Sequence, residues 1–389
     1  MPTSSLRRIT LTGSTFAAMF FLGVGTAIIG AAARNIGLTP VQIGLLLTGQ
    51  NFGFIVAALI GGALADAWPK TRLLLVGSIA MGIGFFLFFT NDLFWPNFLV
   101  AVLLGVAMGL YEASTDALLL EIHCTHQSRY IGLNHLAATL GMGGITAYLI
   151  FLDLHWRRSL IEAGVVVLLL AVLFAFVRSA PAQNGDARFW RHLRELPRKP
   201  LAGALVLATI LAVGAELAAV GYLTSFLMEM RGFDQAASKV GLLLFLGGIA
   251  CGRLLMGLLA NNTAIPRLLV TLFGLAALNF AGLFFLPGRA LIYPLVVAAG
   301  LSLSALCPLL IAVGGLLFPR HCGAVIGMIK TGIPLGGMIV PFFISLLARQ
   351  GGMALALWIF PIVCLGGLGL ILALTAAGAF EALSRRESI

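Results

Sequence analysis

Long apolar runs recur along the chain, and glycines, prolines and charged residues separate one run from the next. A helix of about 20 mostly apolar residues crosses a bilayer core about 30 Å thick. The runs are continuous rather than alternating in short segments, which favours helices over a membrane β-barrel. The pattern predicts twelve membrane-spanning helices at approximately residues 9–33, 41–65, 73–90, 98–122, 130–152, 159–178, 201–229, 236–260, 268–286, 290–318, 323–348 and 353–375.

Composition supports a membrane protein. Of the 389 residues, 60% are hydrophobic and 10% are charged, whereas soluble domains carry about 25% charged residues. The first apolar run is too long for a signal peptide and lacks a small-residue cleavage site, so we expect a retained first helix. The five cysteines are scattered without CxxC spacing, and neither GxGxxG nor a P-loop occurs. We therefore expect no disulfide, no metal site and no cofactor.

The distribution of basic residues predicts the orientation. With the N-terminus inside, fifteen Lys and Arg lie on the cytoplasmic side and seven on the other side, so both termini should be cytoplasmic in a cell membrane. The net charge of +10 then reflects cytoplasmic loops rather than a nucleic-acid partner. The only long loop, residues 179–200, separates an N-terminal half (1–178) from a C-terminal half (201–389). We expect a solvated linker there, or alternatively a short surface helix.

Two stretches of the first half return in the second half. "GLYEASTDALLL" from Gly109 aligns with "GLSLSALCPLLI" from Gly300 at an offset of 191, and "GGALADAWPKTRLLL" aligns with "MGLLANNTAIPRLLV" at an offset of 195. Duplicated halves around a site near the midplane are typical of secondary transporters. The predicted fold is therefore an all-α integral membrane protein with two pseudo-symmetric six-helix halves.

The loop between the second and third spans carries a recognisable motif. Its residues match GxLADxxGRR at Gly62, Leu64, Ala65, Asp66 and Lys70, followed by Arg72, with Pro69 in place of the usual Gly. On this motif, its degenerate second copy and the twelve spans, the chain resembles the major facilitator superfamily. Members usually act as monomers, so the resemblance implies a monomer.

The resemblance implies that the motif is a latch that holds the two halves together in the outward-facing state. Asp66 would lie at the N-terminus of the eleventh span, where free amides and the helix dipole favour an anion. Lys70 or Arg72 would reach Glu121. Arg253 would belong to the second motif copy, with a substrate contact as the alternative.

Other stretches resemble the fucose, galactose and glucose proton-symporter branch of the superfamily. The pattern consists of a proline in the tenth span, glycines and a proline in the eleventh, and an acid in the seventh: Pro308, Gly332, Gly336, Gly337, Pro341 and Glu216. The fifth span lacks the GPxxGG ending of drug/proton antiporters. The resemblance therefore implies symport rather than antiport.

Three acids are candidates for proton coupling. Glu112 and Asp116 are one turn apart and share a helix face, which must avoid lipid because an ionised Asp at a helix centre costs roughly 2.5–3.5 kcal/mol. Repulsion between two carboxylates at this distance disfavours ionisation of both at once, so we expect one of them to bind and release a proton. Alternatively, Asp116 pairs with a loop cation. Glu216 is a midplane acid with no charge near it in sequence, and its alternative is a neutral structural carboxyl.

Polar residues within the spans are candidates for substrate binding. They are Gln50, Asn51, Asn134, His135, Tyr222 and Lys330. The alternatives are interhelical hydrogen bonds for the amides and snorkelling to the cytoplasm for the lysine. All five tryptophans fall near span ends or in loops. A sugar substrate is thereby weakened, because no Trp remains at midplane to stack on a sugar ring.

The sequence thus favours a proton-coupled symporter for a sugar-like or carboxylate-bearing small molecule, which rocks its halves around a central site. A proton-coupled efflux antiporter for amphipathic compounds is the alternative. A non-transporting sensor is disfavoured because no sizeable soluble domain accompanies the spans. We expect no enzymatic activity. The expected partners are the solute, protons and the lipid bilayer.

Overall fold

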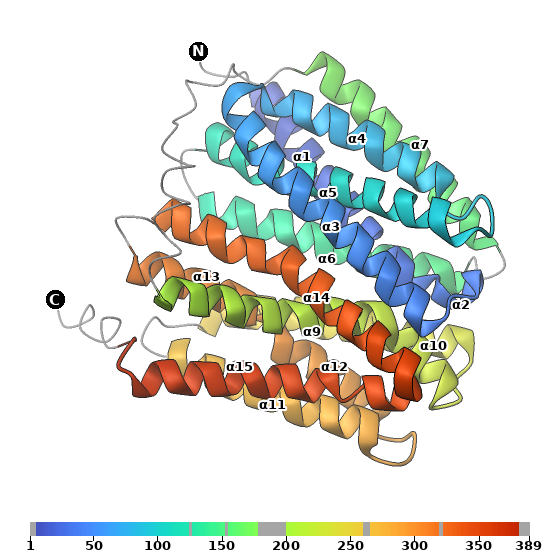
Figure 1. Ribbon diagram of the computed structural model, residues 1–389. Helices are drawn as coiled ribbons and strands as arrows, with labels where there is room; N and C mark the ends of the chain where they lie inside the picture. Colours follow the sequence, from blue (N-terminus) through green and yellow to red (C-terminus); the bar gives the residue numbers. More distant parts are fainter. Residues whose placement is uncertain are drawn as a thin grey trace. The chain divides into compact units, whose positions relative to one another are not determined.

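All secondary structure in the described part of the chain is helical (Figure 1). The computed structural model describes residues 5–123, 127–151, 155–177, 200–259, 265–318 and 322–380. The chain divides into two compact units, Met1–Asp186 and Ala187–Ile389. The predicted central loop lies outside the described residues except for Pro200.

The first unit contains helices for the first six predicted spans and one short extra helix. They are α1 (Ser5–Ala31), α2 (Ala33–Ile36), α3 (Pro40–Ala67), α4 (Lys70–Leu87), α5 (Phe94–Ile122), α6 (Gln127–Phe151) and α7 (Trp156–Phe176). The start of α3 is well specified: Thr39 and Gln42 form a capping box, and Pro40 occupies the first turn, where its missing N–H costs nothing.

The second unit contains the remaining spans. Its helices are α9 (Pro200–Glu229), α10 (Gln235–Leu259), α11 (Ile265–Phe285), α12 (Ile292–Ser304), α13 (Leu306–Leu317), α14 (Cys322–Ala356) and α15 (Ile359–Ala376). The predicted tenth span is two helices that meet at Ala305. The backbone of α14 leaves helical geometry at Gly351 and Gly352, where Gly352 has a φ of +74°. The last span begins after this break, at Ile359 rather than near 353.

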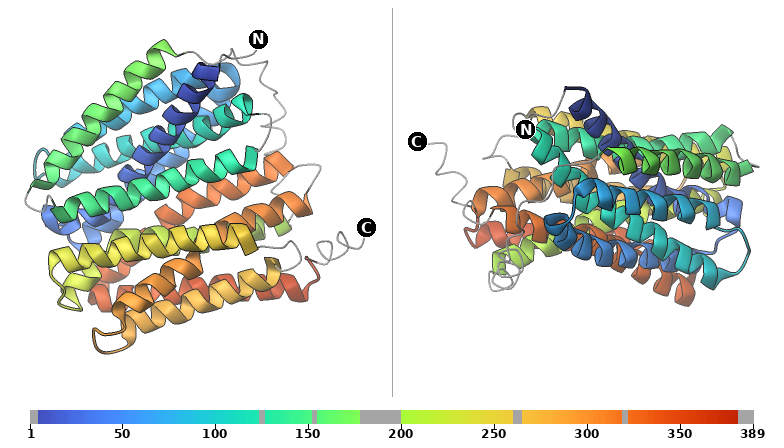
Figure 2. Two further views of the ribbon diagram at one scale, coloured as in Figure 1. Left: turned by 180° about the vertical axis from the view of Figure 1, so that it is seen from behind. Right: turned by 90° about the horizontal axis from the view of Figure 1, so that it is seen from above.

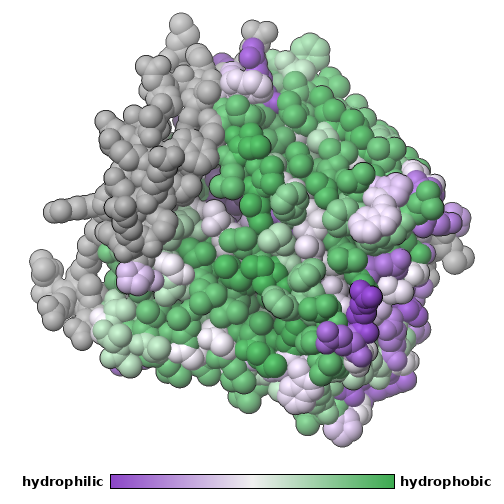
Figure 3. All heavy atoms as spheres, in the orientation of Figure 1, coloured by the Kyte–Doolittle hydropathy of each residue, from purple (hydrophilic) through white to green (hydrophobic). Residues whose placement is uncertain are grey.

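Eleven helical segments of the described chain are long and apolar enough to cross a membrane, with α12 and α13 counted together as one segment. The remaining predicted span corresponds to α6, in which several glycines and the polar Asn134 and His135 dilute the apolar residues. Large apolar side chains, such as Leu99, Phe151 and Phe176, are exposed on the helices, and hydrophobic residues cover much of the face drawn in Figure 3. Such a surface suits contact with lipid chains.

The two units repeat one packing scheme. In the first unit, extensive helix contacts join α1 to α6, α3 to α5, and α4 to α7. The second unit repeats them between α9 and α14, α10 and α12, and α11 and α15, and the long helices run side by side in both views of Figure 2. Each pair joins the corresponding spans of its half, so the predicted duplication is visible in the packing.

Glycines at equivalent positions bring two of these helix pairs into backbone contact. A Cβ atom on any of these glycines would crowd a carbonyl oxygen of the facing helix. The pairs are Gly53 with Val102 and Gly105 with Gln50 in the first unit, and Gly248 with Val297 and Gly300 with Phe245 in the second. Small residues allow such close approach in membranes.

Each contact in the second unit lies 195 positions after its counterpart, as from 53 to 248 and from 105 to 300. Gly105, not Gly109, is therefore the counterpart of Gly300. The alignment at an offset of 191 is therefore displaced by one helical turn from the register that these backbone contacts show.

Candidate functional site

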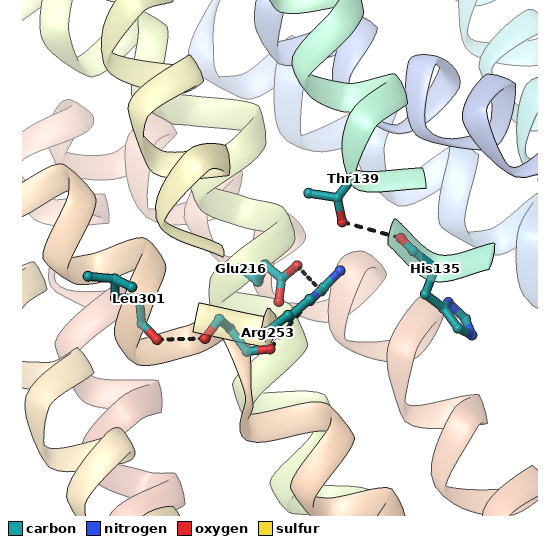
Figure 4. Close-up of polar contacts among 6 residues, drawn as sticks. His135, Thr139, Glu216, Arg253 and Leu301 are labelled. Atoms are coloured by element: carbon teal, nitrogen blue, oxygen red, sulfur yellow. Dashed lines mark hydrogen bonds and ion pairs between the residues drawn. The ribbon is translucent and has the colours of Figure 1, made fainter. Parts of the chain in front are cut away.

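An ion pair joins two membrane-spanning helices of the second unit. The guanidinium Nη2 of Arg253 on α10 lies 2.9 Å from the carboxylate Oε1 of Glu216 on α9 (Figure 4). The side chain of Glu216 is 7% exposed and that of Arg253 is 25% exposed. The arginine is therefore more exposed than the acid, and each charge offsets the desolvation of the other.

The break between α12 and α13 supplies a second acceptor for Arg253. In an uninterrupted helix the carbonyl of Ser304 would accept from the N–H of residue 308, but Pro308 has no N–H. Arg253 Nε instead donates to this carbonyl at 3.3 Å. The Ser304 hydroxyl donates to the Leu301 carbonyl at 2.7 Å (Figure 4). Gly252 permits the approach, because a Cβ there would overlap the Ser304 hydroxyl.

These contacts correct one interpretation of the sequence. Glu216 is isolated in sequence but not in space, since its partner Arg253 lies 37 residues away on the neighbouring helix. Arg253 lies within a membrane-spanning segment of α10. Its predicted part in a second latch motif stays a prediction, whereas the contacts with Glu216 and Ser304 are present in the structure.

Two further predicted site residues lie elsewhere in the second unit. Tyr222 is buried on α9, and its hydroxyl donates to the Pro341 carbonyl of α14 at 3.3 Å. This contact joins the two helices, so a structural role accounts for it. Lys330 is half-buried on α14, eight residues after the helix begins at Cys322. A substrate contact for either residue stays a prediction.

In the first unit, polar groups of α5 and α6 form one cluster. The amide Nδ2 of the buried Asn134 lies 2.9 Å from Asp116 Oδ1 and 3.1 Å from Thr115 Oγ1, and donates to both. His135 Nε2 lies 3.4 Å from Asp116 Oδ2. The Asp116 side chain is 13% exposed and that of His135 is 34% exposed. The structure thus brings together three predicted site residues from two helices.

Glu112 belongs to the same cluster. Glu112, Asp116 and His135 each offer one atom that could ligate a metal ion, and these three atoms lie within 4.8 Å of one another. The predicted proximity of the two acids is therefore present, with a titratable imidazole beside them. Such clusters are common without a bound ion, and the sequence carries no metal-binding motif. The expectation that no metal binds stays a prediction.

The amides of the second predicted span serve the packing of the bundle. Gln50 on α3 is buried, and its Nε2 donates to the Gly25 carbonyl of α1 at 2.9 Å. Asn51 is also buried and donates to the Leu47 carbonyl of its own helix at 2.9 Å. The bond of Gln50 is an interhelical hydrogen bond, as the structural alternative expects, whereas the bond from Asn51 to Leu47 stays within α3. Substrate contact for these residues stays a prediction.

Part of the predicted latch is visible within the first unit. Lys70, at the start of α4, forms an ion pair with Glu121 near the end of α5. Arg72 is exposed, and Gly62 lies in α3 with open space around it. The side chain of Asp66 lies outside the described residues, so its contact with the eleventh span stays a prediction.

Sequence reasoning missed two features. The Ser304 acceptor could have been found from Pro308, because a proline inside a helix always leaves one carbonyl without its helical partner. The second feature is His123 after α5, whose ring stacks on Tyr130 and whose Nε2 lies 2.8 Å from Thr12 Oγ1. Burial and the charge of Arg8 lower the pKa of His123. No sequence signal pointed to this contact among three helices.

Comparison with known proteins identifies the family. A sequence model described as the Major Facilitator Superfamily matches residues 11–321. The chain belongs to this superfamily. The relationship inferred from the motif and the twelve spans is thereby confirmed, and the protein is a multi-pass membrane transporter for a small-molecule solute.

Several transporters are similar in sequence. The 3-(3-hydroxy-phenyl)propionate transporter of Escherichia coli is 27% identical in an alignment of 281 positions that covers 67% of each chain. A probable sulfoacetate transporter of Cupriavidus necator is 26% identical in an alignment of 360 positions that covers 82% of this chain and 81% of the relative. The quinolone resistance protein NorA of Staphylococcus aureus is 22% identical over 210 residues, 50% of this chain and 53% of the relative.

A solved structure confirms the superfamily fold. A bacterial homolog of the human lysosomal transporter Spinster, in an inward-facing and unoccupied conformation, has a TM-score of 0.75. The match covers 99% of this chain and 98% of the other at 15% sequence identity. The likeness concerns the fold, and the side chains of the site must be interpreted from this chain alone.

Proposed function

We propose that this superfamily member is a proton-coupled symporter for small organic anions that carry a carboxylate. The observation that carries the proposal is the ion pair between Glu216 and Arg253 in two membrane-spanning helices. Ionisable residues within spans mark substrate and proton pathways. A guanidinium is suited to a carboxylate ligand, because its planar N–H groups match the two carboxylate oxygens.

The comparisons support the carboxylate over the sugar-like solute. Two relatives matched over two thirds of the chain or more are named for 3-(3-hydroxy-phenyl)propionate and sulfoacetate, which are both organic acids. The absence of tryptophan from the middle of the spans points the same way. The proposed substrate class is therefore a small acid with one carboxylate and a variable remainder.

The first unit offers a second place for protons. Glu112 and Asp116 stay our candidates for coupling there, since they lie beside His135 in the cluster of α5 and α6. Asn134 would position Asp116 by its hydrogen bond. Glu216 ranks before this cluster because it pairs with a cation that itself suits the substrate.

Efflux of amphipathic compounds is the second candidate function, and the match to NorA favours it. That match covers half of each chain. The two functions differ in the sign of coupling. A symporter accumulates its solute on the side to which protons flow, whereas an antiporter expels its solute from that side.

The proposal includes the predicted orientation, with both termini and the loop 179–200 in the cytoplasm. The excess of fifteen over seven basic residues supports it. A protease site placed between Gln183 and Arg188 should resist cleavage in intact cells and be cut after the cells are opened. Cleavage in intact cells would reverse the orientation.

Uptake into proteoliposomes tests the proposed function. Liposomes that contain the purified protein, and protein-free liposomes as the control, are diluted into acidic buffer, and entry of labelled sulfoacetate and 3-(3-hydroxyphenyl)propionate is followed. We expect accumulation that requires the protein and that a protonophore abolishes, and no accumulation of the amide of the second acid. Equal entry with and without the pH gradient would contradict proton coupling, and uptake of the amide would contradict the carboxylate requirement.

A further inference from the structure

We propose that Arg253 is the carboxylate anchor of this transporter and that Glu216 occupies the anchor only while it is ionised, so that one proton is taken up with each carboxylate bound. The proposal deepens the proposed function and rests on it. It assigns one charged residue to the solute and another to the proton.

Contacts with Ser304 and Glu216 hold Arg253 in place. Its guanidinium donates to them through different nitrogens, from Nε to the Ser304 carbonyl and from Nη2 to the Glu216 carboxylate. The carbonyl cannot be protonated at physiological pH, so this contact is independent of pH. The contact with Glu216 weakens when that carboxyl gains a proton. Protonation therefore loosens one side of the guanidinium while Ser304 keeps its position.

The charges of Glu216 and Arg253 link the proton to the solute. The pair of ionised Glu216 and Arg253 is neutral overall. Protonation of Glu216 alone would leave the cation unbalanced in a low-dielectric bundle, which is costly. A solute carboxylate that binds Arg253 restores neutrality, because a neutral acid, a guanidinium cation and a carboxylate anion again sum to zero. Proton and anion therefore bind cooperatively, and each disfavours the other's loss.

Other charged or titratable residues lie on the helices around Glu216. The helices packed against α9 are α10, α12, α13, α14 and α15. Their charged or titratable residues that are at least partly buried are Lys239, Arg253, Tyr293, Cys307, Lys330 and Cys364. Among the described contacts of these residues, the only ion pair with Glu216 is that of Arg253. The ionisation of Glu216 is therefore tied first to the state of Arg253.

Arg253 and Glu216 differ in exposure. A quarter of the Arg253 side chain is exposed, against 7% of that of Glu216, so Arg253 is the more accessible of the two, and in this proposal the solute binds to it first. The proton comes from water on the loading side, protonates a carboxylate oxygen of Glu216, and returns to water on the other side after the solute has left. No other bond forms or breaks.

Binding measured as a function of pH tests the proposal. The probe is a panel of acids from acetate to 3-(3-hydroxyphenyl)propionate and sulfoacetate, each carboxylate beside its amide, on the purified full-length protein. For the wild type we expect acid-specific binding whose Kd falls about tenfold for each unit of decreasing pH, as one linked proton requires. In Glu216→Gln, a mimic of the protonated acid, the Kd should match that of the wild type at low pH and stay constant with pH.

Variants of Arg253 complete the test. Arg253→Gln should abolish acid-specific binding. Arg253→Lys keeps the charge but not the two-nitrogen geometry, so we expect a Kd at least tenfold higher with the pH dependence retained. Glu229→Gln removes a carboxylate from the exposed end of the same helix and should behave like the wild type.

Two results would overturn the proposal. One is an unchanged pH dependence of the Kd in Glu216→Gln, and the other is acid-specific binding in folded Arg253→Gln or Arg253→Lys with the wild-type Kd. Either result together with proton-driven uptake of acids would leave the proposed function standing and refute the inference. Absence of acid-specific binding across the panel in the wild type would refute both.

Discussion

Glu216 is a residue whose truncation should be more harmful than its neutralisation. Glu216→Ala leaves the half-buried guanidinium of Arg253 without its counter-charge, and breaking a buried pair in this way costs about 3 kcal/mol or more. Glu216→Gln also removes the counter-charge, but it retains an oxygen that accepts a hydrogen bond from Nη2. We expect the unfolding temperature in detergent to fall for both variants, and to fall further for Glu216→Ala than for Glu216→Gln.

The double variant separates this effect from lost packing. Glu216→Ala combined with Arg253→Met removes both charges, so part of the lost stability should return. The two residues do not interact if the loss of stability in the double variant equals the sum of the losses in the Glu216→Ala and Arg253→Met single variants.

The sequence identified most of the polar residues of the site but few of their partners. Glu216 and Arg253 were each conspicuous as charges in apolar runs, yet their separation of 37 residues concealed the ion pair. Glu112 and Asp116 were paired correctly because a spacing of four residues on one helix determines their proximity. Contacts within a helix follow from periodicity, whereas contacts between helices depend on packing and rotation.

At the scale of the helices, α10 and α12 depend on a backbone contact that glycine alone permits. A Cβ at Gly248 would crowd the Val297 carbonyl, whereas nothing lies within 4 Å of a Cβ at the adjacent Gly247. We expect Gly248→Ala to destabilise the protein by about 1–3 kcal/mol through overpacking. Gly247→Ala is the matched control and should be neutral or slightly stabilising, since alanine favours helix.

Thermal unfolding of both variants measures the difference. Because α10 carries Arg253 and α12 ends at Ser304, acid binding should also weaken in Gly248→Ala. Equal stability of the two variants would mean that this helix contact is looser than the structure shows.

The helices themselves were largely predictable, because lipid requires continuous apolar runs and charged residues interrupt them. The break at Ala305 was not predicted. The composition of residues 290–318 is apolar throughout, and Pro308 is compatible with either a kink or a break. The register of the repeat was also uncertain by one turn until the glycine contacts at Gly105 and Gly300 resolved it.

At the scale of the whole molecule, the protein is a transporter built from two related helical units. The superfamily match and the repeated packing scheme establish this architecture. The second unit contains the ion pair of Glu216 and Arg253, which we propose as the coupled acid and the anion anchor, and the first unit contains the cluster around Asp116. The central claim is that a proton crosses the membrane with each solute anion.

Proton entry during solute entry tests this claim most directly. Proteoliposomes with a pH-sensitive dye inside and equal pH on both sides receive sulfoacetate, whose sulfonate stays ionised and so prevents passage through lipid as a neutral acid; protein-free liposomes are the control. We predict acidification of the lumen in step with sulfoacetate entry for the wild type, and none for Glu216→Gln. Sulfoacetate entry in the wild type without acidification would contradict the account.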